Sequence, residues 1–247
     1  MSAVSIRGAR KRFGDPDTGT PVLDGIDLDV AAGEFVAIVG ASGCGKSTLL
    51  HAAAGFERLD AGEVQINGVP VTEPSRRHVY VAQEPSVFPW FTVVENIAFG
   101  LRDLAPSEIA RRVQEHVALV GLQGFEDAYP YELSGGMKQR LEFARALAVD
   151  PAVLLLDEPF GALDAITRLQ MRREILRIWI ATRTTCVLVT HDVDEACELA
   201  DRVCVLSPRP ARILEILPIA LERPRSLDAP EVRDVRSRVY GLLRVDR

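Results

Sequence analysis

The sequence predicts an α/β fold with a parallel sheet, an N-terminal antiparallel layer and an inserted block of helices. Short, wholly apolar segments alternate with helix-like segments, a pattern typical of parallel strands joined by right-handed crossovers. The stretch 26–30 instead alternates apolar and acidic residues, as a half-buried antiparallel strand does. Between residues 92 and 147 the pattern becomes helical and separates two strand-rich parts.

The N-terminal region contains two kinds of strand. Ile26, Leu28 and Val30 share one face, while acidic residues occupy the other face. Residues 35–39 form a continuous apolar run, which indicates a fully buried central strand that leads directly into a glycine-rich turn. Residues 47–54 then predict a helix.

A hairpin and a short strand follow. The dipeptide Asn67-Gly68 lies between apolar residues within 64–71, and both residue types tolerate the positive φ angles of a tight turn. Residues 79–81 predict another strand, which ends at Gln83.

The inserted block shows a helix start and one apolar helix face. Thr92 and Glu95 have the spacing of a capping box, in which each side chain accepts a hydrogen bond from the other's backbone. The apolar residues that repeat at intervals of three and four are Ile109, Val113, Val117 and Val120. We therefore expect a helical subdomain here.

Strand-like segments return at 153–156 and 186–189, an apolar segment follows at 213–217, and a helix is predicted after Pro230. We expect one domain over residues 1–247. Its core comprises 1–83 and 151–225, its helical subdomain comprises 84–150, and a C-terminal helix occupies 226–247.

Composition excludes several classes of protein. The hydrophobic content of 47% supports a packed core and excludes disorder. No apolar run reaches the roughly 18 residues that span a bilayer, and the N-terminus lacks a secretory signal, so we expect a cytosolic chain unless a partner holds it at a membrane. The net charge of −6 argues against non-specific binding of nucleic acid.

The cysteines and the C-terminal arginines give weaker signals. Four cysteines show neither metal-ligand nor disulfide spacing, so we expect reduced and mostly buried thiols. From Arg223 onward, arginines alternate with acidic residues. This pattern favours a solvated helical face, and a phosphate or lipid patch is the alternative.

A glycine-rich segment predicts a nucleotide site. Gly40, Gly45, Lys46 and Ser47 satisfy the phosphate-loop pattern G-x-x-x-x-G-K-[ST], with a buried strand before it and a helix after it. In such a loop the backbone N–H groups surround phosphate oxygens, the lysine reaches the β- and γ-phosphates of ATP, and the serine hydroxyl ligates Mg²⁺. The alternative is a glycine turn with a surface lysine. The predicted nucleotide-binding residues of the loop are Gly40, Ala41, Ser42, Gly43, Cys44, Gly45, Lys46, Ser47 and Thr48.

Three side chains that follow buried strands are predicted to complete the chemistry. Asp157 stands at the carboxyl end of 154–157 and is expected to hold Mg²⁺, because open α/β sheets bind ligands at that edge. Glu158 is the predicted general base, although it could instead cap a helix or pair with an arginine. His191 follows 187–189 and is predicted to contact the γ-phosphate, the alternative being a core histidine. The other histidines are treated as structural.

A second anion site is predicted at Ser134-Gly135-Gly136. Ser134 can cap a helix whose glycine first turn exposes free N–H groups. The segment Leu133–Arg140 resembles the signature of ATP-binding cassette (ABC) ATPases, and with the phosphate loop, Gln83, Asp157-Glu158 and His191 the resemblance extends over nearly the whole chain. It implies a P-loop NTPase (RecA-like) core with a parallel sheet, an N-terminal antiparallel β subdomain and an inserted α-helical subdomain.

The resemblance also implies roles that the residues alone do not show. Such ATPases form head-to-tail homodimers, with two ATP molecules between each phosphate loop and the opposite signature, so that Ser134, Gly135 and Gly136 would contact nucleotide. The loop 161–164, including Asp164, would cross the dimer interface. Phe13 would stack on adenine, although it could equally be an ordinary strand residue. Gln83 would contact Mg²⁺ and the attacking water.

A narrower resemblance is to the ATPase subunits of importers for nitrate, sulfonates, taurine and similar small solutes. The segments that carry this resemblance are 54–56, 88–90, 96–101, 159–164 and 206–210. Residues 83–85 and Met137 are less usual in the family.

This narrower resemblance implies an ATP-hydrolysing, energy-coupling subunit at the cytoplasmic face of the cell membrane. It would dock on separate permease subunits through the aromatic residues near Trp90, with an external solute-binding protein in the full system and no nucleic acid. Local core packing is the alternative for the aromatic residues. The alternatives for function are a soluble ABC ATPase acting on nucleic acid or ribosomes, and an exporter subunit.

Overall fold

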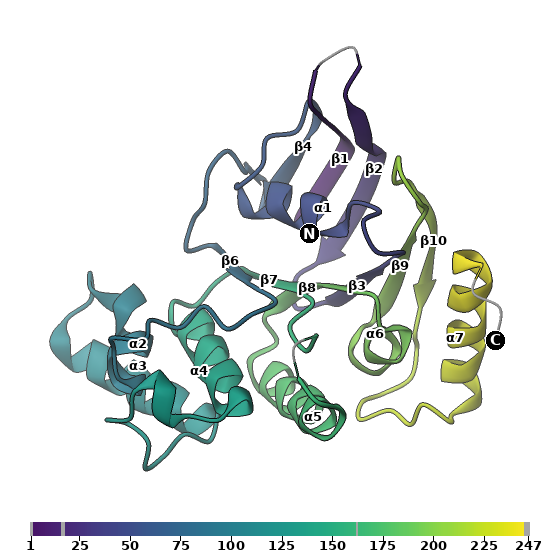
Figure 1. The fold of residues 1–247 in the computed structure, drawn as a ribbon. Coiled ribbons are helices and arrows are strands. Elements are labelled where there is room, and N and C mark those ends of the chain that lie inside the picture. Colours follow the sequence, from purple (N-terminus) through teal and green to yellow (C-terminus); the bar gives the residue numbers. More distant parts are fainter. Residues whose placement is uncertain (1, 16–17, 162, 245–247) are drawn as a thin grey trace. The chain divides into compact units, whose positions relative to one another are not determined.

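A computed structural model describes residues 2–15, 18–161 and 163–244 and divides the chain into two compact units (Figure 1). Unit 1 comprises Met1–His78, Ala152–Glu158 and Arg183–Arg247. Unit 2 comprises Val79–Pro151 and Pro159–Thr182. Residues 159–182, which the sequence analysis assigned to the core, therefore group with the helical part of the chain.

Unit 1 begins with an antiparallel sheet in the order β2-β1-β4-β5. Its strands are β1 (Ser2–Phe13), β2 (Thr20–Ala31), β4 (Ala61–Ile66) and β5 (Val69–Pro70). The predicted alternation is confirmed, because Ile26, Leu28 and Val30 are all buried. The predicted hairpin is also confirmed. Asn67 and Gly68 connect β4 to β5 with φ angles of 49° and 75°, values that suit a twisted two-residue turn.

The second sheet of unit 1 is parallel apart from one strand. The unit 1 strands that form it are β3 (Phe35–Val39), β7 (Val153–Asp157), β8 (Thr185–Thr190), β9 (Arg202–Leu206) and β10 (Ile213–Pro218), in the order β10-β9-β3-β8-β7. β10 is antiparallel to β9, and the other pairs are parallel. Every residue of β3, β7 and β8 is buried, as the continuous apolar runs predicted.

Helices cover both faces of the parallel sheet in unit 1. α1 (Lys46–Ala54) contacts β7 and β8, and α6 (Val193–Leu199) contacts β3 and β8 from the other face (Figure 1). The C-terminal helix α7 (Pro230–Leu243) packs on α6. It begins later than the predicted residue 226, because Pro230 suits the first position of a helix and residues before it form turns. The last predicted residues, 245–247, lie outside the described residues.

The C-terminal arginines match the predicted solvated helical face only in part. Arg233 and Arg238 of α7 are exposed, whereas Arg225, which precedes the helix, is not. Arg225 is buried, and its guanidinium donates hydrogen bonds to the carbonyl oxygens of Leu221 at 2.7 Å, Cys197 at 3.2 Å and Ile219 at 3.0 Å, as well as to that of Ala200. Since Cys197 and Ala200 stand at the end of α6, this arginine satisfies carbonyl groups that the helix leaves free. Burial lowers the pKa of Arg225 to about 10.

Unit 2 is mainly helical. β6 (His78–Val81) carries the chain into it from unit 1. Its helices are α2 (Val93–Ala98), α3 (Pro106–Leu119), α4 (Gly135–Ala148) and α5 (Ala165–Thr182), with short 3₁₀ turns at Phe99–Leu101 and Pro130–Glu132. α2, α3 and α4 pack on one another.

Two further predictions for unit 2 are confirmed. Thr92 Oγ1 accepts from the Glu95 N–H at 3.3 Å, and the Glu95 carboxylate accepts from the Thr92 N–H at 2.8 Å. The apolar stripe on α3 is confirmed at Val113, Val117 and Val120, which are buried, whereas Ile109 is half-buried. Within the described parts of the chain, no helix combines the length and the apolar character needed to span a bilayer.

The four cysteines are free and buried, as expected. Burial raises the pKa of the Cys197 and Cys204 thiols to about 12, which keeps both protonated and unreactive at neutral pH.

Candidate active site

The register of the parallel strands brings the predicted catalytic residues of unit 1 to one edge of the sheet. Val39 pairs with Thr190, and Asp157 pairs with Val189. The phosphate loop, Glu158 and His191 therefore leave the sheet at the same level from three adjacent strands. This edge carries the carboxyl ends of the strands, where ligands bind in open α/β sheets.

The phosphate loop connects β3 to α1 and depends on glycine. Gly43 and Gly45 have φ angles of 74° and 124°, which side chains disfavour. A Cβ on Gly45 would lie 2.9 Å from Val22 Cγ1, and one on Gly40 would lie 2.7 Å from Cys44 Sγ. No side chain caps the start of α1, so the first N–H groups of this helix are available to an anion.

The ammonium group of Lys46 lies inside this loop. The residue is buried, with 4% of its surface exposed. Its Nζ donates to the carbonyl oxygens of Gly40 at 3.0 Å and Ala41 at 3.2 Å. Both acceptors are uncharged, so the positive charge of Lys46 is not neutralised by them and can attract phosphate.

Ser47 and Asp157 form a hydrogen-bonded pair. The Ser47 hydroxyl donates to Asp157 Oδ1 at 3.1 Å, and Asp157 is buried at the end of β7. The described residues contain no group of three or more His, Cys, Asp and Glu side chains that could hold a metal ion by themselves. One hydroxyl and one carboxylate nevertheless fit Mg²⁺, which prefers oxygen ligands and usually keeps water and substrate phosphates among its ligands.

Glu158 and His191 form the second pair. Nδ1 of His191 lies 2.9 Å from Glu158 Oε2, and 62% of the histidine side chain is exposed. The core-histidine alternative is therefore wrong, and the carboxylate of Glu158 is engaged by this histidine. Glu158 has a φ of 45°, and its N–H donates to the Val189 carbonyl at 2.8 Å. A left-handed conformation costs a non-glycine residue about 1–2 kcal/mol, so the neighbouring strand holds this turn in place.

Phe13 ends β1 in unit 1 and is 44% exposed. The Lys11 ammonium lies 5.2 Å from the centre of its ring. An exposed aromatic ring at a strand end can accept a stacked base, and this role of Phe13 stays a prediction.

Unit 2 contains the predicted signature site at the start of α4. Ser134 Oγ accepts from the Met137 N–H at 3.3 Å, so Ser134 is the N-cap, as predicted. Gly135 and Gly136 form the first turn. A Cβ on Gly136 would lie 3.3 Å from Thr167 Cγ2, so glycine allows the starts of α4 and α5 to approach closely.

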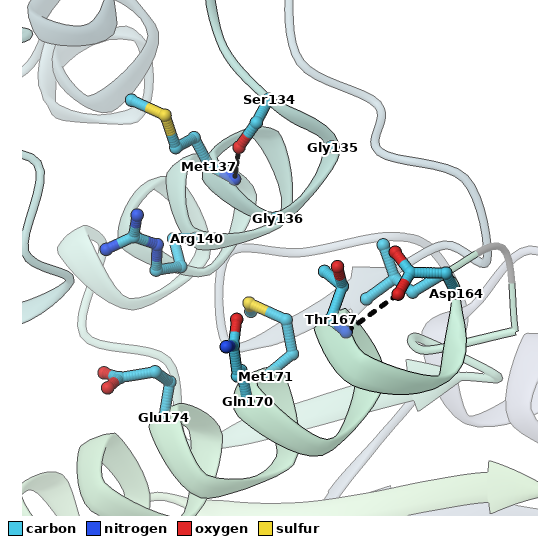
Figure 2. Close-up of a pocket in the computed structure, with 11 residues that line it drawn as sticks. Ser134, Gly135, Gly136, Met137, Arg140, Asp164, Thr167, Gln170, Met171 and Glu174 are labelled. Carbon is cyan, nitrogen blue, oxygen red and sulfur yellow. Dashed lines mark hydrogen bonds between the residues drawn. The ribbon is translucent and has the colours of Figure 1, made fainter.

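A pocket of about 660 Å³ opens beside this helix start (Figure 2). The residues that line it are Ser134, Gly135, Gly136, Met137, Arg140, Leu163, Asp164, Thr167, Gln170, Met171 and Glu174. The lining mixes polar and apolar residues. The helix N-terminus and Arg140 can attract an anion, while the carboxylates of Asp164 and Glu174 lie in the same wall.

Asp164 lines this pocket and also caps α5. Its Oδ1 accepts from the N–H groups of Ile166 and Thr167, both at 3.1 Å, and the hydrogen bond to the Thr167 hydroxyl is the main cause of its lowered pKa. Ala162, in the same predicted interface loop, lies outside the described residues. Gln83 is exposed in unit 2, just after β6, and its predicted contact with Mg²⁺ stays a prediction.

Sequence reasoning missed a buried ionic network on the signature helix. Glu142 in α4 is 1% exposed, and its Oε1 accepts from the hydroxyl of Ser86 at 2.7 Å and from the Ser86 N–H at 3.0 Å. Arg145 donates to the carbonyl and hydroxyl oxygens of Ser86, both at 2.9 Å. The network attaches the signature helix to the segment after Gln83. Its only sequence signal is a charged residue between Leu141 and Phe143.

These features define a phosphate-loop nucleoside triphosphatase, with a second predicted anion site on a separate helical unit. Similarity to known proteins supports this assignment. The ABC transporter family profile matches residues 23–161. The aliphatic sulfonates import ATP-binding protein SsuB of Bacillus subtilis (strain 168) is 45% identical over 239 residues, which are 97% of this chain and 93% of that protein. The putative ATP-binding protein BAB2_1147 of Brucella abortus (strain 2308) is 45% identical over 242 residues, 96% and 92% of the two chains.

Solved structures show the same fold. A dimeric post-hydrolysis state of the ATP-binding cassette MJ0796, bound to ADP and Pi, has a TM-score of 0.74 and 26% identity and covers 89% of this chain and all of that one. The dimeric structure of MJ0796, a bacterial ABC transporter cassette, has a TM-score of 0.75 and 27% identity, with the same coverage. The chain belongs to the ABC transporter family. It is an ATP-binding subunit with ATPase activity.

We expect Glu158→Gln to retain ATP binding and to lower turnover by about 10²–10⁴-fold, because an amide cannot accept the proton of the attacking water. Equilibrium binding of ATP and steady-state phosphate release measure the two effects. Glu222→Gln, at an exposed position of the same unit, is the matched control. Full ATPase activity in Glu158→Gln would remove Glu158 from its predicted role.

We also expect Glu142 to make the stability of the folded protein depend on pH. Burial raises the pKa of Glu142 above its ordinary value of 4.5. Between these two pKa values the folded state binds more protons than the unfolded chain, so the free energy of unfolding falls as the pH rises through this window. Glu142→Gln removes this titration, and its stability relative to the wild type should therefore increase as the pH rises above 4.5. Urea unfolding across pH, with Glu222→Gln as control, tests this, and a constant difference would contradict it.

Proposed function

We propose that this ATPase is the energy-coupling subunit of an importer for sulfonates. Nitrate, taurine or a similar small solute is the alternative substrate. The observation that carries the proposal is the likeness, over nearly the full length of both chains, to proteins named as aliphatic sulfonates import ATP-binding proteins. The chain would lie at the cytoplasmic face of the membrane, bound to separate permease subunits. An external solute-binding protein would deliver the solute.

Within unit 1, each residue has a distinct role in hydrolysis. The N–H groups of residues 40–48 bind the phosphates, and Lys46 balances the charge on the β- and γ-phosphates. Ser47 and Asp157 would hold Mg²⁺, and the family resemblance implies a further contact from Gln83. Mg²⁺, when bound, neutralises charge that develops on the phosphate oxygens.

Glu158 and His191 activate the attacking water. Glu158 accepts the proton of the attacking water, and His191 orients the Glu158 carboxylate and contacts the γ-phosphate. The distance of 2.9 Å between His191 Nδ1 and Glu158 Oε2 supports the role of His191 in orienting this carboxylate.

The signature site supports a shared catalytic centre. Ser134, Gly135 and Gly136 offer a helix start to an anion, yet this unit lacks a phosphate loop, which lies in residues 40–48 of unit 1. A second copy of the chain would provide the missing phosphate in a head-to-tail homodimer. The dimeric state of the MJ0796 cassettes supports this arrangement.

An aromatic cluster in unit 2 is the proposed docking surface for a permease. Phe88 packs on Phe99 with ring centres 4.5 Å apart and on Trp90 at 5.8 Å, while Trp90 remains 66% exposed. The buried Asn96 fixes the backbone of this loop, since its amide nitrogen donates to the carbonyls of Phe88 at 3.1 Å and Phe91 at 2.9 Å. Local packing explains Phe88 but not the exposure of Trp90, which suits a partner surface.

Growth of the host tests the proposed solute class. We expect deletion of the chain to abolish growth on an aliphatic sulfonate as sole sulfur source, while growth on sulfate is retained. The wild-type chain should restore growth, and Glu158→Gln should not. Parallel cultures with taurine as sulfur source and nitrate as nitrogen source assign the solute. Unchanged growth on all three would contradict import of this class.

Ser134→Arg tests the shared catalytic centre. The larger side chain fills the anion site, so ATP should no longer produce a dimer and ATPase activity should fall by roughly 10²-fold or more. Light scattering and phosphate release provide the measurements. Ser107→Arg, which places the same side chain in the first turn of α3, should behave as the wild type. A Ser134→Arg monomer that hydrolyses ATP at wild-type speed would refute the shared centre.

A further inference from the structure

The loop between β9 and β10 contacts the phosphate loop through a side chain that lies outside the nucleotide-binding motifs. The guanidinium Nε of Arg209 donates a hydrogen bond to the carbonyl oxygen of Gly43. Its Nη2 atom lies 3.6 Å from the position that a Cβ on Gly43 would occupy. Arg209 therefore covers the exposed turn of the phosphate loop, and both residues belong to unit 1.

The loop that presents Arg209 is itself held in place. The Ser207 hydroxyl accepts from the Arg212 N–H at 3.0 Å, which closes the turn. Ala211 is fully buried, and its N–H donates to the Val22 carbonyl of β2 at 2.8 Å. Arg209 thus extends toward Gly43 from a base that is attached to both sheets of unit 1.

The peptide that Arg209 contacts carries one of the N–H groups of the phosphate loop. In a planar trans peptide the C=O and N–H bonds point in opposite directions, so a fixed Gly43 carbonyl also fixes the N–H of Cys44. That N–H points into the loop, where it donates to the Ala41 carbonyl at 3.1 Å. Glycine at 43 allows many backbone conformations, and the contact with Arg209 adds a second restraint on this peptide to the one that the Ala41 carbonyl provides.

We propose that Arg209 is a positioning residue that pre-orients the peptide between Gly43 and Cys44 for binding nucleotide phosphates. The proposal rests on the phosphate-binding role of residues 40–48. Arg209 acts through the loop backbone and lowers the cost of ordering the loop when nucleotide binds. The interaction is a directional hydrogen bond, so its effect persists at salt concentrations that screen exposed charges.

Binding of a fluorescent ADP analogue, with competition by ATP, tests this inference. Arg209→Ala should weaken binding by about three- to tenfold, the effect of one lost hydrogen bond, and should raise KM more than it lowers kcat. The loss should be similar at low and high salt. Arg209→Lys, which keeps a charged donor, should recover most of the affinity. Arg212→Ala is the matched control, because Arg212 is an exposed arginine of the same loop that pairs with Asp24 instead of the phosphate loop.

Hydrogen exchange provides a readout that a general loss of stability would not produce. In nucleotide-free Arg209→Ala, the amides of residues 41–45 should exchange faster while those of β3 and β8 remain unchanged. Equal affinity in Arg209→Ala and Arg212→Ala would overturn the inference. So would a loss confined to low salt, or one seen only in ATP-dependent dimerisation.

Lys46→Ala separates this inference from the proposed function. If Lys46→Ala binds nucleotide like the wild type, the phosphate loop is not the binding site and both proposals fail. If Lys46→Ala loses binding while Arg209→Ala does not, the role of Arg209 alone is refuted.

Discussion

Parallel pairing of β3, β8 and β7 is the constraint on which the arrangement of the predicted catalytic residues depends. It places Val39 beside Thr190 and Val189 beside Asp157, so the loops that follow must emerge together. A shift of one residue would turn every side chain of a strand to the opposite face and bury the wrong groups. Because both faces of these strands are buried, such a shift would require the core to repack on both sides, and the geometry of the site therefore depends on the packing of the core.

The residues predicted to carry out the chemistry are divided between two units of the chain. Unit 1 contains the phosphate loop, the carboxylates and His191, whereas unit 2 contains Gln83 and the signature helix. An ATPase that couples hydrolysis to movement needs parts that can move while each keeps its own geometry. The Glu142 network serves this need inside unit 2, because it attaches the signature helix to the segment that contains the proposed docking residues.

Features that depend on neighbouring residues were predictable from the sequence. The turn at Asn67-Gly68, the Thr92 capping box and the cap at Ser134 all follow from local backbone chemistry, and the structure confirms them. The burial of Arg225 was not predicted, for the opposite reason. Arg225 reaches carbonyls at the end of α6, more than 20 residues away in sequence, and an alternating charge pattern contains no information about such a contact.

The sequence by itself determined the class of protein, because a phosphate loop, a carboxylate after a buried strand and a capped glycine helix start each require particular residue types at short spacing. Only the tertiary structure showed three hydrogen-bonded contacts between distant residues. These are Glu158 with His191, Glu142 with Ser86, and Arg209 with Gly43. Each of these contacts joins residues from separate elements. Their formation depends on strand register and on the packing of the core, which no local pattern specifies.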